Sequence, residues 1–136
     1  MLAEELEQRR NFYPDVVRAL DRAQLDRFGL MVSVLDVVRA TRPFIIPCYS
    51  DSSEMCVRGR SPTLTNPNPQ DRVLVCVDDW RSFGPFSELG NLPIESVALI
   101  EFYGLRGSQV RVYTVEWMLS RVRTGRTSVY PLLFGC

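Results

Sequence analysis

The apolar run Val73–Val77, which ends in Asp78 and Asp79, constrains the fold of this chain most strongly. Five consecutive apolar residues followed by an acidic turn are typical of a strand that is covered on both faces. The preceding segment, Ser61–Asp71, holds three prolines and two asparagines, and predicts an exposed loop without regular structure. We therefore expect the chain to fold around Val73–Val77 as a strand of a sheet.

Shorter apolar segments predict the remaining strands. Val16–Leu20 and Met55–Val57 are two of them, and a third strand is expected to begin at Glu95 and Ser96 and to continue to Phe102. In residues 110–114, apolar and polar side chains alternate, which predicts an edge strand with one wet face.

Capping signals predict two short helices near the N-terminus. Asp21 and Gln24 have the spacing of a capping box, and Gly29 supplies the C-terminal stop. Ser33 opens a second helix, which Pro43 closes. Three more helical segments are expected: Leu2–Arg10, which is heavily charged, a single turn within Phe86–Leu92, and Val115–Arg123, which Gly125 ends.

This order of elements predicts an α/β (α+β) fold, with a small mixed sheet of about four short strands packed with two to four short helices. At 136 residues, 46% of them hydrophobic, the chain is long enough to bury a core. We assign residues 1–14 to a charged N-terminal helical extension and residues 15–136 to a single domain.

Composition narrows the classes of function. Sixteen basic residues, all arginine, balance sixteen acidic residues, so no net charge draws the chain to nucleic acid or to an anionic membrane. The chain has no histidine, the commonest general base and metal ligand, and we therefore expect no catalytic residues, no cofactor and no metal site. No apolar run approaches the ~20 residues that span a bilayer.

The four cysteines lack the close pairs that zinc sites use. Cys48 and Cys56 flank a polar loop and can form a disulfide if the compartment is oxidising. Cys76 lies inside the apolar strand and is expected to be a small buried hydrophobe.

Two groups of residues could carry chemistry. Asp78 and Asp79 could bind a hard cation or act as an acid–base pair, but adjacent strand residues point to opposite faces, and an acidic turn is the simpler explanation. Arg58 and Arg60 flank Gly59 and could clamp a carboxylate or a phosphate, with a solvated pair as the alternative.

Three motifs, taken in order, resemble the plug domain of TonB-dependent outer-membrane receptors. They are Arg58-Gly59-Arg60, similar to an "RG" strand, the run that ends in Val77-Asp78-Asp79, similar to "V-x-V-D-G", and the segment from Ile94-Glu95-Ser96 to Tyr103-Gly104, similar to "I-E-S-I-E-V-x-x-G". Asp79 stands where the family carries glycine, which argues against a tight turn with positive φ.

The resemblance covers residues 20–114 and implies a non-enzymatic domain at the periplasmic side of the cell outer membrane. Such a domain occludes or gates a receptor barrel, or serves as a protein-binding module. Its partner would be that barrel or an energy-transducing envelope protein. The expected partner-contact residues are Arg58, Gly59, Arg60, Asp78, Asp79, Tyr103 and Gly104.

The sequence departs from the plug pattern in three ways: it contains no barrel, it has no segment like a TonB box near its start, and residues 115–123 predict a helix where the family has a terminal strand. Two alternatives stay open. A cytoplasmic protein-interaction adaptor would fit the acidic segment 1–10, which lacks the apolar core of a signal peptide. A small metal-dependent enzyme would use Asp78, Asp79 and nearby carboxylates.

Overall fold

A computed structural model of the chain describes residues 7–8, 16–29, 32–58, 64, 70–104, 109–124 and 136. Its strands are β1 (Val16–Leu20), β2 (Ile45–Pro47), β3 (Met55–Arg58), β4 (Gln70–Arg72), β5 (Leu74–Val77), β6 (Trp80–Arg81), β7 (Val97–Tyr103) and β8 (Gln109–Thr114). Its helices are α2 (Arg22–Leu25), α3 (Val34–Thr41), α4 (Pro85–Gly90) and α5 (Val115–Arg123), with 3-10 turns η1 (Asp26–Phe28) and η2 (Ile94–Ser96).

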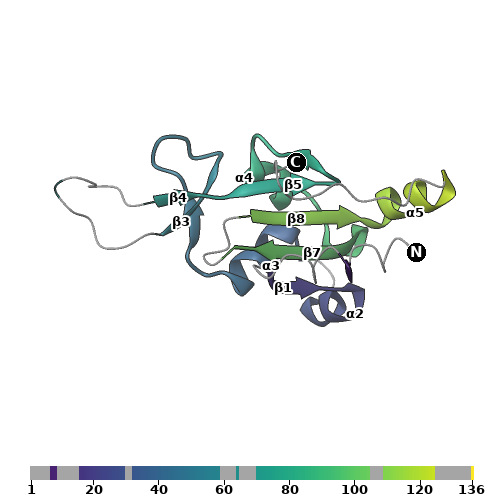
Figure 1. The fold of residues 1–136 in the computed structure, drawn as a ribbon. Coiled ribbons are helices and arrows are strands. Elements are labelled where there is room, and N and C mark those ends of the chain that lie inside the picture. Colours follow the sequence, from purple (N-terminus) through teal and green to yellow (C-terminus); the bar gives the residue numbers. More distant parts are fainter. Residues whose placement is uncertain are drawn as a thin grey trace.

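The described strands form two sheets. One has five strands in the order β1-β7-β8-β5-β6, and the other has three in the order β2-β3-β4. In the larger sheet β8 pairs antiparallel with β7 and parallel with β5, so the sheet is mixed. In Figure 1 the three-stranded sheet lies beyond one end of the larger sheet, and α5 lies beyond the other. The predicted mixed α+β class is confirmed.

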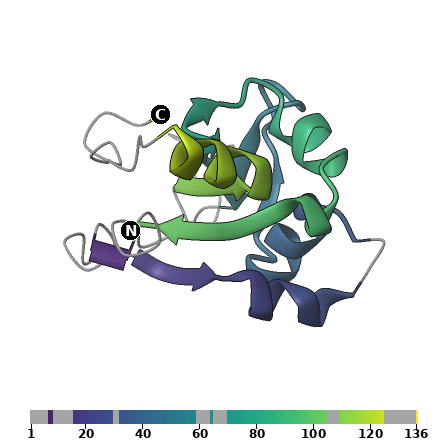
Figure 2. The same cartoon turned by 90° about the vertical axis from the view of Figure 1, so that its right-hand side faces the viewer.

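One face of the five-stranded sheet forms the hydrophobic core with α2, α3 and α4. Helix α3 directs Val34, Val37 and Val38 into this core, and all three are fully buried. The strands supply Leu20, Val75, Ile100, Phe102, Val110 and Val112. Figure 2 views the molecule from the end at which α5 lies.

The predicted signals of the first two helices are confirmed. The Asp21 carboxylate accepts a hydrogen bond from the backbone N–H of Gln24, and the Gln24 side chain accepts one from the backbone N–H of Asp21, both at 2.9 Å. Ser33 and Asp36 form the same reciprocal box at the start of α3. Gly29 ends the first helical segment with a φ of 85°, which a residue with a Cβ rarely adopts.

Several predicted strand boundaries are wrong. The segment 110–114 is not an edge strand with a wet face, because β8 lies between β7 and β5 and both of its faces are buried. Residues 94–96 form η2, so the third predicted strand begins at Val97. Gln70–Arg72, expected at the end of a loop, pairs with β3. Tertiary pairing supplied strands where local composition predicted none.

Other predictions lie outside the described residues: most of the N-terminal extension, residues 61–63 and 65–69 of the loop, and the helix stop at Gly125. Among the described helices, none has both the length and the apolar character that crossing a membrane requires.

Candidate functional site

The turn between β5 and β6 contains both predicted aspartates. Val77 pairs with Trp80, so Asp78 and Asp79 form a two-residue hairpin turn. Their φ angles are 52° and 64°, the left-handed values that this kind of hairpin turn requires. The expectation that Asp79 would prevent a positive-φ turn is therefore wrong. Aspartate adopts left-handed backbone more readily than most residues with a Cβ, because its short side chain can hydrogen-bond locally.

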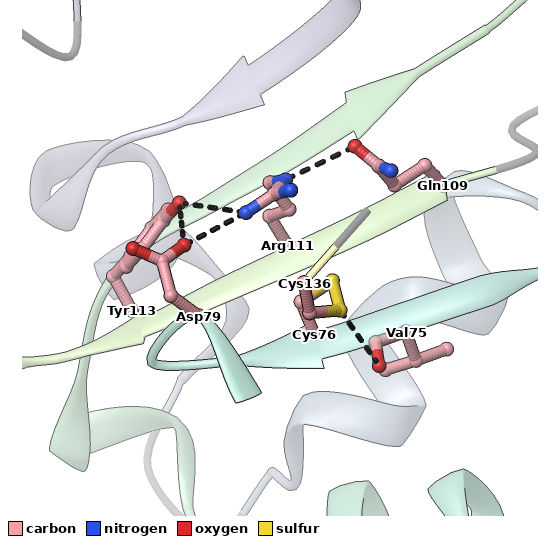
Figure 3. Close-up of a disulfide and its surroundings, with 7 residues drawn as sticks. All are labelled: Val75, Cys76, Asp79, Gln109, Arg111, Tyr113 and Cys136. Carbon is pink, nitrogen blue, oxygen red and sulfur yellow. Dashed lines mark hydrogen bonds and ion pairs between the residues drawn. A yellow bond between two sulfur atoms is a disulfide. The ribbon is translucent and has the colours of Figure 1, made fainter. Parts of the chain in front are cut away.

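Asp79 is part of a buried polar network on the face of the sheet opposite the hydrophobic core. Its Oδ1 atom accepts a hydrogen bond from Arg111 Nη1 at 2.7 Å and another from the Tyr113 hydroxyl at 2.8 Å (Figure 3). Arg111 also donates from Nε to Gln109 Oε1 at 3.0 Å. Arg111 is only 1% exposed, so these partners supply the hydrogen bonds that water would otherwise make.

Strand β7 extends this network. Glu101 is fully buried and is the cross-strand partner of Arg111 in the register of β7 and β8. The Tyr103 hydroxyl donates a hydrogen bond to Glu101 Oε2 at 2.8 Å. We call this set the buried polar layer: Asp79, Glu101, Tyr103, Gln109, Arg111 and Tyr113.

Asp78 makes different contacts from its neighbour. Its Oδ1 accepts from the backbone N–H of Thr114, and its Oδ2 accepts from the Thr114 hydroxyl, both at 2.7 Å. Thr114 Oγ1 in turn accepts from the backbone N–H of Trp117 at 3.1 Å and caps α5. The turn therefore fixes the start of α5. Burial raises the pKa of Asp78, and the negative charges of Asp79 and Glu116 raise it further, against the lowering effect of the Thr114 hydrogen bonds.

An open groove of about 690 Å³ lies beside α5. It is lined by Asp78, Leu92, Ser96, Thr114, Val115, Glu116, Leu119, Ser120 and Arg123. These residues come from the β5–β6 turn, the segment around η2 and the whole length of α5 with its capping residue Thr114.

All four cysteines are paired. Cys48 bonds to Cys56 with their Cα atoms 5.1 Å apart, which confirms the pairing that the sequence allowed. Cys76 bonds to Cys136, the last residue, with Cα atoms 5.7 Å apart (Figure 3). Cys76 is buried, as expected, but it is not a free hydrophobe. No sequence pattern indicated this pairing, because sixty positions separate the two residues.

The structure does not bring the predicted contact residues into one site. Arg58 is exposed at the end of β3, while Gly59 and Arg60 lie outside the described residues. Tyr103 is buried at the end of β7, and Gly104 follows it with a φ of 91°. Tyr103 pairs with Gln109, at the start of β8, so it lies at the opposite end of the sheet from the Asp78–Asp79 turn, which contacts the end of β8 (Figure 1).

Sequence reasoning missed most of the buried polar layer. Gln109, Arg111 and Tyr113 alternate along β8 with valines that face the core. The same alternation predicted a wet face, although the polar side chains are buried. A charged residue at the centre of each of two adjacent apolar strands, Glu101 and Arg111, was the signal that could have indicated a buried pair.

The aromatic residues Trp80, Tyr113 and Trp117 do not lie together on one exposed surface. Trp80 is 80% exposed, whereas Tyr113 is fully buried with its ring centroid 4.9 Å from that of Trp117. They therefore form no single aromatic surface. Within the described part of the chain, no three histidine, cysteine, aspartate or glutamate side chains are grouped so that they could hold a metal ion.

These features define a mixed α+β domain with two disulfides, a buried polar layer and an open groove beside its last described helix. Comparison of the chain with protein-family models, with curated proteins and with solved structures found no match.

Proposed function

We propose that the chain is a non-enzymatic, plug-like domain of the bacterial cell envelope. It would occlude or gate the barrel of a TonB-dependent receptor, or act as a protein-binding module. Its partner would be the barrel or an energy-transducing envelope protein.

The pairing of all four cysteines carries this proposal furthest. Disulfides persist in oxidising compartments such as the bacterial periplasm and are rare in the cytosol, where thiols are kept reduced. The pairing therefore favours the envelope over the cytoplasmic adaptor that the sequence left open.

The three plug-like motifs give a second line of support, because each falls at the end of a strand. Arg58 ends β3, Asp78 and Asp79 follow β5, and Gly104 follows β7. The Asp78–Asp79 turn also has the positive φ angles that the aspartate–glycine pair of the plug motif would adopt.

The contacts of the two aspartates favour a non-enzymatic role. Asp79 is paired with Arg111, and Asp78 holds Thr114 at the start of α5. Both carboxylates therefore stabilise the fold, and they form hydrogen bonds to different residues.

Fractionation of the producing cells tests the proposal. The native protein would be detected by immunoblot in separated soluble and envelope fractions, after treatment with a maleimide-linked polyethylene glycol that adds mass to each free thiol. We expect an envelope-associated band with no added mass before reduction, and four added groups after reduction.

The size of the band distinguishes the two forms of the proposal. A band several times heavier than 15.6 kDa in the outer membrane would identify the domain as part of a complete receptor. A band near 15.6 kDa in the periplasm would indicate a separate binding module. A soluble cytoplasmic band with four reactive thiols would overturn the proposal in favour of the adaptor.

A further inference from the structure

The helix α5 is incompletely packed. None of its nine residues is fully buried, although the helix begins with a firm cap at Thr114. Trp117 and Met118 pack against the buried Tyr113, but Leu119 and Val122 stay 56% and 55% exposed. Large aliphatic side chains exposed beside a groove are typical of a surface that a partner covers.

The groove beside α5 is lined by both aliphatic and polar side chains. Leu92, Val115 and Leu119 supply aliphatic surface from two separate elements. Ser96, Thr114 and Ser120 add hydroxyl groups to the lining. A lining of apolar side chains with a few polar groups that fix orientation is the usual make-up of a binding groove.

The charges of the groove are unevenly placed. Asp78 and Glu116 line it near the start of α5, and neither forms an ion pair with any residue that the structure describes. Burial raises the pKa of Asp78 against the lowering effect of the Thr114 hydrogen bonds, and the charges of Asp79 and then of Glu116 raise it further. Arg123 lines the groove from the last turn of α5. A cation near Asp78 and Glu116 would relieve this like-charge repulsion.

We infer that this groove binds a short segment of a partner protein in which an arginine or a lysine is flanked by aliphatic side chains. The cation lies against Asp78 and Glu116, and the aliphatic groups cover Leu92, Val115 and Leu119. The inference rests on the proposed role as a protein-binding module and assigns that role to this end of the molecule, opposite Arg58.

A peptide with an arginine between two leucines, serine–glycine ends and a fluorescein label tests the inference. Its affinity for the intact, oxidised protein would be measured by fluorescence anisotropy, and its position by amide chemical shifts in NMR. Citrulline in place of arginine gives a neutral peptide of the same shape. We expect the arginine peptide to bind about threefold to fivefold more tightly than the citrulline peptide.

Variants of the groove separate its parts. Glu116→Gln removes an exposed charge that no described hydrogen bond uses, and should weaken binding of the arginine peptide about threefold. Leu119→Ala should weaken the arginine and citrulline peptides equally. Arg123→Gln removes a like charge and should strengthen binding of the arginine peptide about twofold. Glu88→Gln, an exposed carboxylate on α4, is the matched control and should change nothing.

Three results would overturn the inference: equal affinity of the arginine and citrulline peptides, equal effects of Glu116→Gln and Glu88→Gln, or shifted amides outside the groove. Preference for a peptide with glutamate in place of arginine, lost in Arg123→Gln, would instead indicate an acidic partner and would also contradict it. Each of these failures leaves the envelope location and the thiol pairing to be judged separately by fractionation.

Discussion

Arg111 shows how one charged residue is accommodated in the interior of the sheet. It is 1% exposed, and its guanidinium group donates to Asp79 and to Gln109. Glu101, on the adjacent strand, adds a second negative charge at the same level of the sheet. Removing one member of a buried pair costs far more than forming the pair gains, because the remaining charge is left without a partner.

Replacement of Arg111 by methionine should therefore lower the free energy of unfolding by about 3–5 kcal/mol. Urea denaturation without reductant measures the loss. Arg27→Met, at an exposed position on η1, is the control and should change stability by no more than about 0.5 kcal/mol. If the two variants unfold at the same urea concentration, the buried polar layer contributes nothing to stability.

Asp78 predicts a dependence of stability on pH. Burial raises its folded-state pKa above the ordinary value of 3.8, so the folded protein binds this proton more tightly than the unfolded chain does. The stability that this group contributes is present below pH 3.8 and is lost as the pH rises through the folded-state pKa. Asp78→Asn removes the titration, so its stability relative to wild type should increase with pH over this window. A stability difference that stays constant from acid to neutral pH would contradict the shift.

At the scale of elements, Asp79 in the β5–β6 hairpin has two roles: it forms part of the turn, and it belongs to the buried polar layer. Asp79 holds a left-handed backbone, at a φ of 64°, that glycine adopts without cost. The same residue is the partner of Arg111 across the sheet. Local preference favours glycine here, whereas the tertiary contact requires a carboxylate.

Asp79→Gly should reveal which of the two effects dominates. Relief of the backbone should contribute about 1 kcal/mol, while the lost partner of Arg111 should cost about 3–5 kcal/mol. We expect a net loss of about 2–4 kcal/mol in chemical denaturation. A variant more stable than wild type would show that turn geometry, and not the ion pair, controls this position.

At the scale of the whole molecule, the two disulfides close loops of very different length. The Cys76–Cys136 bond spans sixty positions and ties Cys136 to β5 of the five-stranded sheet, whereas Cys48–Cys56 spans eight and joins β3 to the loop after β2. A cross-link restricts the unfolded chain more when the loop that it closes is longer.

Replacing Cys76 and Cys136 together by serine should therefore lower the free energy of unfolding by about 4 kcal/mol. The same change at Cys48 and Cys56 should lower it by about 2.5 kcal/mol. Urea denaturation of the two double variants under identical non-reducing conditions compares them. A larger loss for the short loop would contradict this order.

Arg58 tests the opposite end of the molecule from the groove. Because its side chain is exposed at the end of β3, Arg58→Glu should change the free energy of unfolding by no more than about 0.5 kcal/mol. If this end contacts a receptor barrel or an envelope protein, the variant should lower the yield of chemical cross-links to that partner in intact envelopes. Arg27→Glu, at another exposed arginine, is the matched control. If the Arg58 variant unfolds instead, Arg58 stabilises the fold and does not contact a partner.

The sequence alone determined what depends on neighbours along the chain. Asp21 with Gln24, and Ser33 before its apolar residues, predicted two helix starts correctly, because capping is completed within four residues. Val73–Val77 predicted the strand β5, and Val115–Arg123 predicted α5. In the site, the sequence correctly singled out Asp78 and Asp79 as a turn and permitted the pairing of Cys48 with Cys56.

Only the tertiary structure decided what depends on pairing across the chain. It placed β8 between β7 and β5, and so buried Arg111 on a face that alternation alone predicts to be wet. It gave Asp79 a partner thirty-two positions away and Cys76 one sixty positions away. Composition and periodicity report which side chains favour water. They do not report which distant strand supplies a countercharge, a hydrogen bond or a thiol, and these distant partners determine the buried polar layer of this protein.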